Sequence, residues 1–161
     1  MRKIPTDSYA SVIAGLIALL SAALPWSSST VQAFGLASTY RSLLDEYIYW
    51  SSLPSADPQT AVLLDANTKV LVAATALVLI VAGGVTGLAG VKWRVARLLA
   101  CVCIAAGLVA FEYMLRPFGN QFTVYSTNRV MVANTTPSWG FIIATLSVFV
   151  LLYAFLRKSN S

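Results

Sequence analysis

The sequence contains no histidine and few charged residues. Without histidine the chain lacks the usual proton carrier at neutral pH and the commonest metal ligand, which excludes His-ligated metals and His-dependent catalytic triads. Charged residues make up 11% of the 161 residues, whereas soluble domains are about one quarter charged. Because 58% of the chain is hydrophobic, we expect lipid to surround most of it.

Cysteine is also scarce. Cys101 and Cys103 lie two positions apart in an apolar run, and such positions face different sides of a helix, so we expect two small core side chains. The sequence has no paired carboxylates, Cys-x-x-Cys motif or phosphate-binding glycine loop. We therefore expect no enzyme activity, no cofactor and no metal site. A thiol reaction at one of these cysteines is the remaining enzymatic alternative.

Four apolar runs predict membrane-spanning helices, since about 20 residues cross a bilayer core. Tyr9 and Trp26 bracket the first run, as interfacial aromatics do. The sequence therefore predicts one domain over 1–161, an all-α integral membrane protein built as a four-transmembrane-helix bundle. A signal peptide cleaved after Ala33 is the rival interpretation of residues 1–33. The expected spans are approximately 9–26, 70–90, 98–115 and 138–156.

A short basic hinge at 91–97, with Lys92, Arg94 and Arg97, predicts the orientation. The net charge of +5 is scattered at the ends of the apolar runs, which favours a topological role over nucleic-acid binding. Seven Lys and Arg residues share the hinge side and four share the other side. The positive-inside rule therefore places both termini and the hinge in the cytoplasm of a multi-pass plasma-membrane protein, with loops 27–68 and 116–137 outside.

The first outer loop contains a helical pattern. Tyr40, Leu43, Leu44, Tyr47 and Ile48 share one helix face, which predicts a short helix capped by the Ser or Thr at 38 and 39. The polar residues at 41, 45 and 46 are expected on the opposite face. Two arrangements are open: a helix in the membrane interface, or one packed across the outer ends of the bundle, which the mixed charge favours.

Further short elements are expected in both outer loops. Asp57-Pro58 is typical of a helix start, for a second short helix ending near Asp65. In the second loop, residues 121–133 hold two β-prone stretches around a polar turn, which predicts a small β-hairpin able to pair with the first loop. Asn134 begins an Asn-Thr-Thr sequon, a candidate glycosylation site on the outer side.

Three further groups are candidate interaction residues. Tyr47, Tyr49 and Trp50 are candidate contact anchors for a partner, or aromatics at headgroup level. Gly83 and Gly87 have the spacing of helix-packing glycines, for general packing or a dimer face. Glu112 with Arg116 is a candidate polar pair at the membrane edge.

The chain leaves its first helix through Leu24-Pro25-Trp26 and joins its middle helices by a tight basic hinge. This layout resembles that of the claudin-like tetraspan proteins. The claudin signature needs Gly-Leu-Trp and a cysteine pair in the loop, whereas Gly35-Leu36 is followed by Ala37 and the loop has no cysteine. The layout is equally similar to small uncharacterised four-helix membrane proteins of prokaryotes, in which a glycine such as Gly140 opens the last helix. Both resemblances imply the architecture and transfer no functional residue.

These features together favour a non-catalytic membrane protein. We expect an accessory subunit or scaffold that acts through its outer loops and helix packing, with membrane lipid around it and a protein partner or second copy beside it. The alternative is an oligomeric channel or transporter component, which needs polar residues inside the bundle. Mid-membrane hydroxyls stand at Ser21, Thr75, Thr86, Thr145 and Ser147.

Overall fold

The structure, a computed structural model, describes residues 6–32, 36–52, 66–115, 122–126 and 129–157. The predicted second short helix at 58–65, Arg116 and the cleavage position at Ala33 lie outside these residues. The described chain is mostly helical, with one small sheet. Its elements are α1 (Thr6–Ala23), β1 (Ser27–Gln32), β2 (Leu36–Arg41), α2 (Leu43–Ser52), α3 (Ala66–Ala89), α4 (Arg94–Leu115), β3 (Phe122–Ser126), β4 (Arg129–Pro137) and α5 (Trp139–Leu156).

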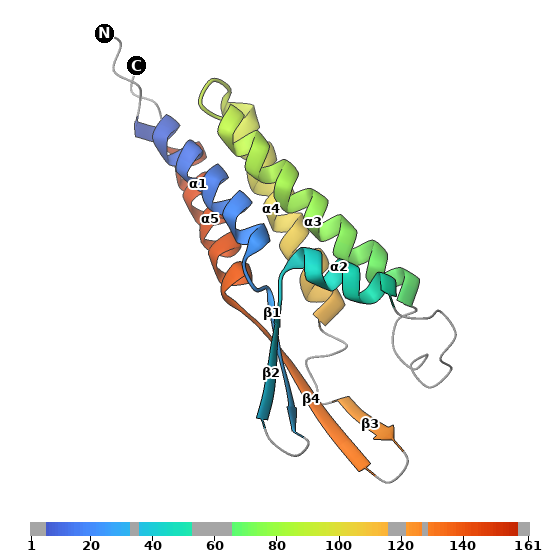
Figure 1. Cartoon of the computed structure of the whole chain (residues 1–161). Helices are drawn as coiled ribbons and strands as arrows, with labels where there is room; N and C mark the ends of the chain where they lie inside the picture. The colour runs from blue at the N-terminus through green and yellow to red at the C-terminus, as the bar shows by residue number, and fades with distance from the viewer. Residues whose placement is uncertain (1–5, 33–35, 53–65, 116–121, 127–128, 158–161) are drawn as a thin grey trace.

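The long helices α1, α3, α4 and α5 form an up-and-down bundle (Figure 1). Helix α1 packs against α3 and α5, and α4 packs against the same two helices, so α1 and α4 lie diagonally across the bundle. Helix α1 begins and α5 ends at the same end as the turn between α3 and α4 (Figure 1). We call this the hinge end, and the opposite end the sheet end.

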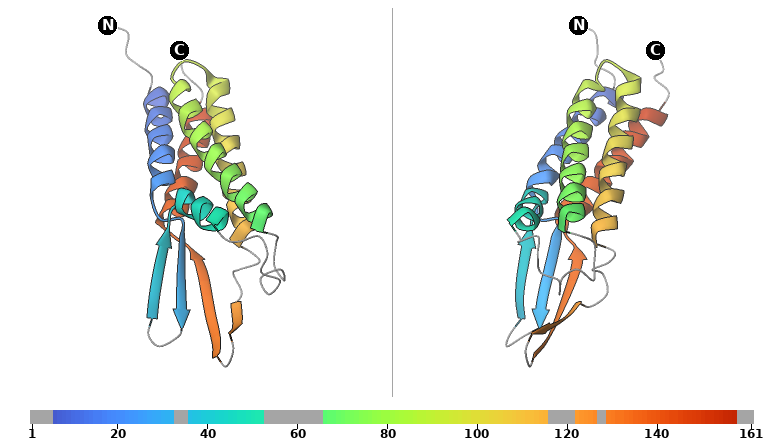
Figure 2. Two further views of the ribbon diagram at one scale, coloured as in Figure 1. Left: turned by 45° about the vertical axis from the view of Figure 1, so that its right-hand side comes forward. Right: turned by 90° about the vertical axis from the view of Figure 1, so that its right-hand side faces the viewer.

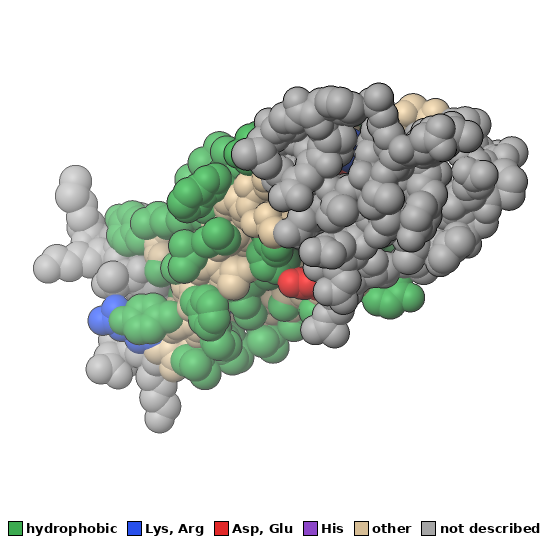
Figure 3. Space-filling model, turned by 90° about the horizontal axis from the view of Figure 1, so that it is seen from below, with side chains coloured by type: hydrophobic (Ala, Val, Ile, Leu, Met, Phe, Trp, Pro, Cys, Tyr) green, Lys and Arg blue, Asp and Glu red, His purple; other side chains and the backbone are tan. Residues whose placement is uncertain are grey.

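Three helices are long and apolar enough to cross a membrane: Thr68–Ala89, Arg94–Tyr113 and Trp139–Leu156. Helix α1 adds a shorter apolar stretch, Ser8–Ala23. Many large apolar side chains of these helices point outward, and they dominate the described helical surface seen from the sheet end (Figure 3). An apolar exterior of this kind suits lipid as the surrounding solvent.

Glycines bring the helices of the bundle close together. A Cβ at Gly15 of α1 would lie 2.7 Å from the carbonyl oxygen of Gly84, and one at Gly87 would lie 3.0 Å from the Gly15 Cα. A Cβ at Gly83 would meet Ile104 Cγ1 of α4 at 2.5 Å. Helix α3 therefore uses neighbouring glycines to approach α1 on one side and α4 on another, the role small residues have in membrane helices.

The two predicted outer loops combine into one antiparallel sheet of four strands in the order β2-β1-β4-β3. Strands β1 and β2 come from the first loop, and β3 and β4 come from the second. The central pair is β1 with β4, where Ser27 lies opposite Pro137 and Gln32 opposite Val132. The sheet extends away from the sheet end of the bundle (Figure 2).

The all-α prediction is wrong for the first loop and needs correction. Residues 27–32 and 36–41 form strands, so Ser38 and Thr39 belong to β2 and do not cap a helix. The Ser- and Thr-rich stretch of β1 resembles a loop in sequence, but β2 and β4 satisfy its backbone groups on both sides. The predicted hairpin in the second loop is confirmed, and so is its pairing with the first loop.

The hinge is shorter than predicted. Helix α3 ends at Ala89 and α4 begins at Arg94, so the turn covers only 90–93. Arg94 and Arg97 therefore stand in the first turn of α4. The charges that made this segment look like a loop are compatible with a helix start because each guanidinium finds carbonyl acceptors nearby.

Candidate functional site

Trp26 joins the bundle to the sheet. Its side chain is fully buried, and its indole Nε1–H donates a hydrogen bond to the carbonyl of Ser21 at 2.6 Å. Its backbone N–H donates to the Arg41 carbonyl at 2.7 Å, and its own carbonyl accepts from the Ser138 N–H at 2.8 Å. One residue thus links the end of α1, the end of β2 and the residue before α5.

Aromatic packing holds the Trp26 ring in place. The ring makes edge-to-face contacts with Phe111 of α4 and Phe141 of α5, at centroid distances of 5.1 and 5.9 Å. Gly140 leaves room for the indole, because a Cβ there would lie 2.6 Å from the Trp26 Nε1. The Gly140 N–H also donates to the carbonyl of Pro25 at 2.7 Å. The Leu-Pro-Trp exit is therefore a packing centre for three helices.

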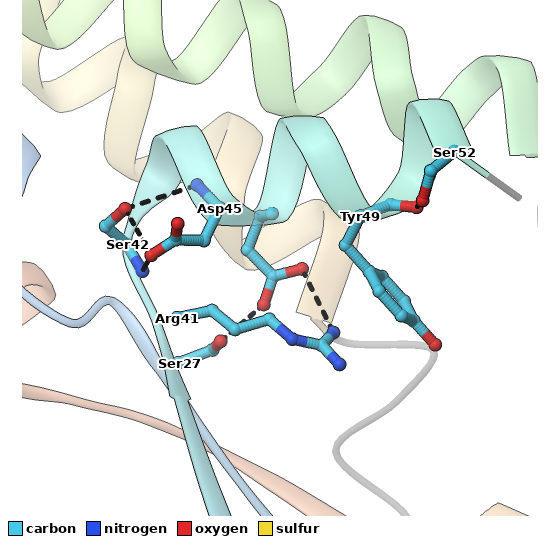
Figure 4. Close-up of polar contacts among 7 residues, drawn as sticks. Ser27, Arg41, Ser42, Asp45, Tyr49 and Ser52 are labelled. Atoms are coloured by element: carbon cyan, nitrogen blue, oxygen red, sulfur yellow. Dashed lines mark hydrogen bonds and ion pairs between the residues drawn. The ribbon is translucent and has the colours of Figure 1, made fainter.

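A polar cluster lies beside this centre and is the candidate site (Figure 4). We call it the junction site and define it as Ser27, Arg41, Glu46 and Tyr49. Glu46 is 4% exposed; its carboxylate accepts a hydrogen bond from the Ser27 hydroxyl and lies 3.8 Å from Arg41 Nη1. The Arg41 guanidinium stacks over the Tyr49 ring at 3.6 Å from the centroid.

The junction site joins three elements. Ser27 begins β1, Arg41 ends β2 and lies opposite Ser27 in the register, and Glu46 comes from α2. A buried carboxylate needs hydrogen bonds and a charge partner to offset its desolvation, and both are supplied here. The arrangement can therefore hold α2 against the end of the sheet nearest the bundle, at Ser27 and Arg41, which we call the sheet root.

The start of α2 is capped locally. Ser42 precedes the helix, and its hydroxyl oxygen accepts from the Asp45 N–H at 3.2 Å, while the Asp45 carboxylate accepts from the Ser42 N–H at 3.0 Å. This reciprocal pair is a capping box with aspartate at its third position. The Ser42 backbone N–H, and then its hydroxyl, hold the pKa of the Asp45 carboxyl below its usual value.

Helix α2 keeps Leu44, Tyr47 and Ile48 together on one side, but it departs from the predicted faces at Leu43 and Glu46. The pattern places Glu46 on the polar side, but it is buried together with Leu43. Leu44 and Ile48, which the pattern places on one face with Leu43, are 51% and 53% exposed. Helix α2 turns one apolar and one acidic residue inward because the sheet root offers Ser27 and Arg41 as partners for the carboxylate. Periodicity alone does not contain that information.

A second polar network lies at the hinge end and centres on Arg97, which is 6% exposed. Its Nε donates to the Gly90 carbonyl at 2.7 Å, its Nη1 to the Ala154 carbonyl at 3.2 Å, and its Nη2 to the Ser8 hydroxyl at 3.3 Å. Ser8 in turn donates to the carbonyl of Val91 at 3.3 Å. We call Ser8, Gly90, Arg97 and Ala154 the hinge-end network.

Arg94 adds a neighbouring contact to the last turn of α5. Its Nη2 donates to the Phe155 carbonyl at 2.9 Å, and the guanidinium lies 4.9 Å from the Phe155 ring centroid. Cations near a helix C-terminus also interact favourably with the helix dipole. Lys92 and Trp93 remain exposed in the turn. The basic hinge therefore divides into two structural arginines and one exposed lysine.

The other residues proposed from the sequence are dispersed. Tyr47 and Tyr49 are 37% and 38% exposed on α2, and the side chain of Trp50 lies outside the described part. Glu112 is half-buried near the end of α4, and its proposed partner lies outside the description. Asn134 stands in β4 opposite Thr30 of β1.

Four of the five mid-membrane hydroxyls proposed from the sequence bond within their own helices. Ser21 donates to the carbonyl of Ala18, and Ser147 to that of Ala144, each at 2.6 Å. Thr86 and Thr145 similarly bond to carbonyls three or four residues earlier. Hydroxyls often satisfy their own helix backbone in this way.

Comparison with known proteins adds no relative: no family model matches the chain, and no curated protein or solved structure matches it. Among the described residues, no group of three or more His, Cys, Asp or Glu side chains is placed to hold a metal ion. The junction site and the hinge-end network are thus characterised by their own geometry.

Sequence reasoning misses both polar networks. It makes Glu46 a solvent-facing charge and Arg97 an orientation signal, whereas both are buried. One signal is available in the sequence: charged residues are rare in this chain, and Arg97 is followed by an uncharged, apolar stretch that continues through Phe111. The partners, however, are 7 to 89 residues away from Arg97 in the chain.

Proposed function

We propose that this protein is a non-catalytic scaffold or accessory subunit, held in the membrane by four helices and acting through its sheet. Helix α1 supports the count of four because it has 18 residues, as α5 does. At about 1.5 Å per residue each is roughly 27 Å long, near the roughly 30 Å of a bilayer core. Helix α1 also packs between α3 and α5 as an integral part of the bundle.

Charge supports a cytoplasmic hinge end. Lys92, Arg94 and Arg97 lie at that end, where α1 begins and α5 ends (Figure 1). Basic residues near short turns favour the cytoplasmic side. With both helix ends and the turn on that side, the sheet is extracytoplasmic and available to partners outside the cell membrane. The resemblance to claudin-like tetraspan proteins remains part of this proposal for the order of helices and loops, and no functional residue is transferred from that family.

The observation that carries the proposal is the way the sheet is attached. Trp26 links the end of α1, the end of β2 and the residue before α5 through hydrogen bonds, and the junction site holds α2 against the same end of the sheet. A sheet attached this firmly presents a constant surface, which suits recognition by a second protein or a second copy. Strands β2 and β3 lie at its two edges, and edge strands are common sites of strand addition.

Exposed aromatic residues near the sheet root are suitable contact anchors. Tyr40 of edge strand β2 is 62% exposed, and Tyr49 of α2 is 38% exposed. Tyrosine is enriched among residues that dominate interface energies. We place the proposed contact surface on β2 and the adjoining Tyr49 side of α2.

The test is the mass of the protein extracted from native membranes in mild detergent, measured by light scattering. We expect a complex well above the 17.2 kDa of one chain. Tyr40→Ala should release most of the partner, because it removes an anchor from the proposed surface. Trp93→Ala is the matched control, since Trp93 is 68% exposed at the hinge end. A wild-type protein that elutes as a lone monomer would contradict the scaffold function.

The alternative of an oligomeric channel or transporter component has less support. A conduction path needs polar groups that remain available to the permeating species. The hydroxyls of Ser21, Thr86, Thr145 and Ser147 instead donate to their own helices. This engagement favours the scaffold over the channel.

A further inference from the structure

We propose that the apolar side of α2, formed by Leu44, Tyr47 and Ile48, lies in the membrane leaflet at the sheet end, with lipid as its occupant. The first observation is its exposure. These side chains are 51%, 37% and 53% exposed, and at 3.6 residues per turn they share one side of the helix. They are distinct from the inward side, where Leu43 and Glu46 are buried.

The second observation is the position of the polar side chains. Asp45, Tyr49 and Ser52 lie on the side of α2 that faces away from α3, as do Arg41 and Ser42 just before it (Figure 4). The same view shows the strands of the sheet leaving in that direction. Helix α2 is therefore polar towards the sheet and apolar on a different side, the division expected of a helix lying in a membrane interface.

The third observation is depth. Helix α2 packs against α3, and two views place it level with the sheet-end turns of α3 and α4 (Figures 1 and 2). Those turns belong to candidate membrane spans. Leu71 and Val78 of α3 are 68% and 64% exposed, and their seven-residue spacing puts them on one face. The apolar side of α2 thus adjoins helices whose own exposed surface suits lipid.

The chemistry of this side favours lipid over a protein partner. It carries no charge, and Tyr47 at its edge combines an apolar ring with a hydroxyl that suits the headgroup level. A water-soluble partner would have to enter the lipid layer to reach it. A second copy could reach it within the membrane, and the experiment below separates that case. This inference depends on a membrane-embedded bundle and not on the scaffold function.

The experiment places a fluorescent bimane label at single cysteines in the full chain, reconstituted into phosphatidylcholine vesicles. Cys101 and Cys103 are first replaced by alanine. The test positions are Leu44→Cys and Ile48→Cys, and the matched control is Asp45→Cys, which is exposed on the same helix. Quenching by a nitroxide lipid labelled near the headgroup is compared with quenching by aqueous iodide.

We expect the ratio of lipid quenching to iodide quenching to be severalfold higher at Leu44→Cys and Ile48→Cys than at Asp45→Cys. Equal ratios at all three positions would overturn the proposal. Shielding of the test positions from both quenchers, relieved when the protein is diluted in lipid, would overturn it in favour of a second copy.

A second measurement keeps the native cysteines. Hydrogen exchange of the α2 amides is followed in vesicles for the wild type and for the double variant Leu44→Asp, Ile48→Asp. We expect exchange in α2 to become severalfold faster in the variant, while α5 exchanges as in the wild type. Unchanged exchange in α2 would overturn the proposal, because a helix that no longer packs against lipid on one side must be less protected. If the exchange result is as expected and the wild-type protein still elutes as a monomer, the scaffold function is refuted and the lipid contact of α2 is not.

Discussion

Trp26 shows how much one residue contributes to this architecture. Its position after the first apolar run suggests an interfacial aromatic, yet its side chain is fully buried. The indole N–H finds the Ser21 carbonyl, the ring finds Phe111 and Phe141, and the backbone bonds to β2 and to the residue before α5. A buried tryptophan needs a partner for its N–H. The Ser21 carbonyl in the last turn of α1 supplies one, and it also accepts from the Leu24 N–H.

Substitution of Gly140 tests this packing. Gly140→Ala places a methyl group against the indole of Trp26 and within 2.9 Å of the Pro25 carbonyl oxygen. Overpacking of this kind costs about 1–3 kcal/mol. We expect a loss of that size in the free energy of unfolding, measured by denaturant titration in detergent. Ile142→Ala on the same helix is the control, because Ile142 is 46% exposed.

The mechanism can be separated from a general helix effect. Combining Gly140→Ala with Trp26→Phe makes room for the methyl group. The double variant should therefore lose less unfolding free energy than the sum of the losses of the two single variants. Strict additivity would show that the methyl group and the indole do not compete for the same space.

At the scale of elements, α2 and α4 show where periodic patterns are informative and where they are not. Apolar periodicity predicts helices in both regions, and helices are present. The orientation of α2 depends on the carboxylate partners at Ser27 and Arg41. The start of α4 depends on carbonyl acceptors for Arg97 that α5 and the turn after α3 provide. A charged side chain moves inward wherever the fold satisfies it.

A matched pair of variants tests the hinge-end network. Arg97→Met and Lys92→Met each remove one positive charge from the same end of the bundle. Arg97→Met also removes the hydrogen bonds to Gly90, Ala154 and Ser8. Leaving such buried groups unpaired costs about 1–3 kcal/mol. We expect Arg97→Met to lower the unfolding free energy by that amount and Lys92→Met to leave it nearly unchanged, as measured by denaturant titration.

Equal losses for the two variants would contradict this account. They would show that net charge at the hinge end, and not the hydrogen-bonded position of Arg97, determines the stability of the bundle.

At the scale of the whole molecule, the sheet makes one body of segments far apart in the chain. Strands β1 and β4 come from separate predicted loops and pair over their full common length. Their pairing also brings the end of α1 next to the start of α5, where the Ser138 N–H donates to the Trp26 carbonyl. Bundle and sheet therefore support each other, since the sheet root is buried among the ends of the helices.

The proposed orientation gives a prediction at this scale. In a cysteine-free background, Lys92→Cys should react with a membrane-impermeant maleimide only in inside-out vesicles, because positive charge favours the cytoplasmic side. Tyr40→Cys should react only in right-side-out vesicles. Mass spectrometry of the labelled chain measures both reactions. Labelling of both positions from one side would refute the proposed orientation and the count of four spans.

The sequence by itself determined the apolar helices, the hairpin of the second loop and the tight basic turn. These features depend on local composition and periodicity, which are present in the sequence of each segment by itself. Tertiary structure alone decided that Ser27–Gln32 is a strand, that Glu46 and Arg97 are buried, and that Trp26 is a packing centre. Each of these depends on partners distant in sequence, because backbone groups and charges leave solvent only where the folded chain satisfies them.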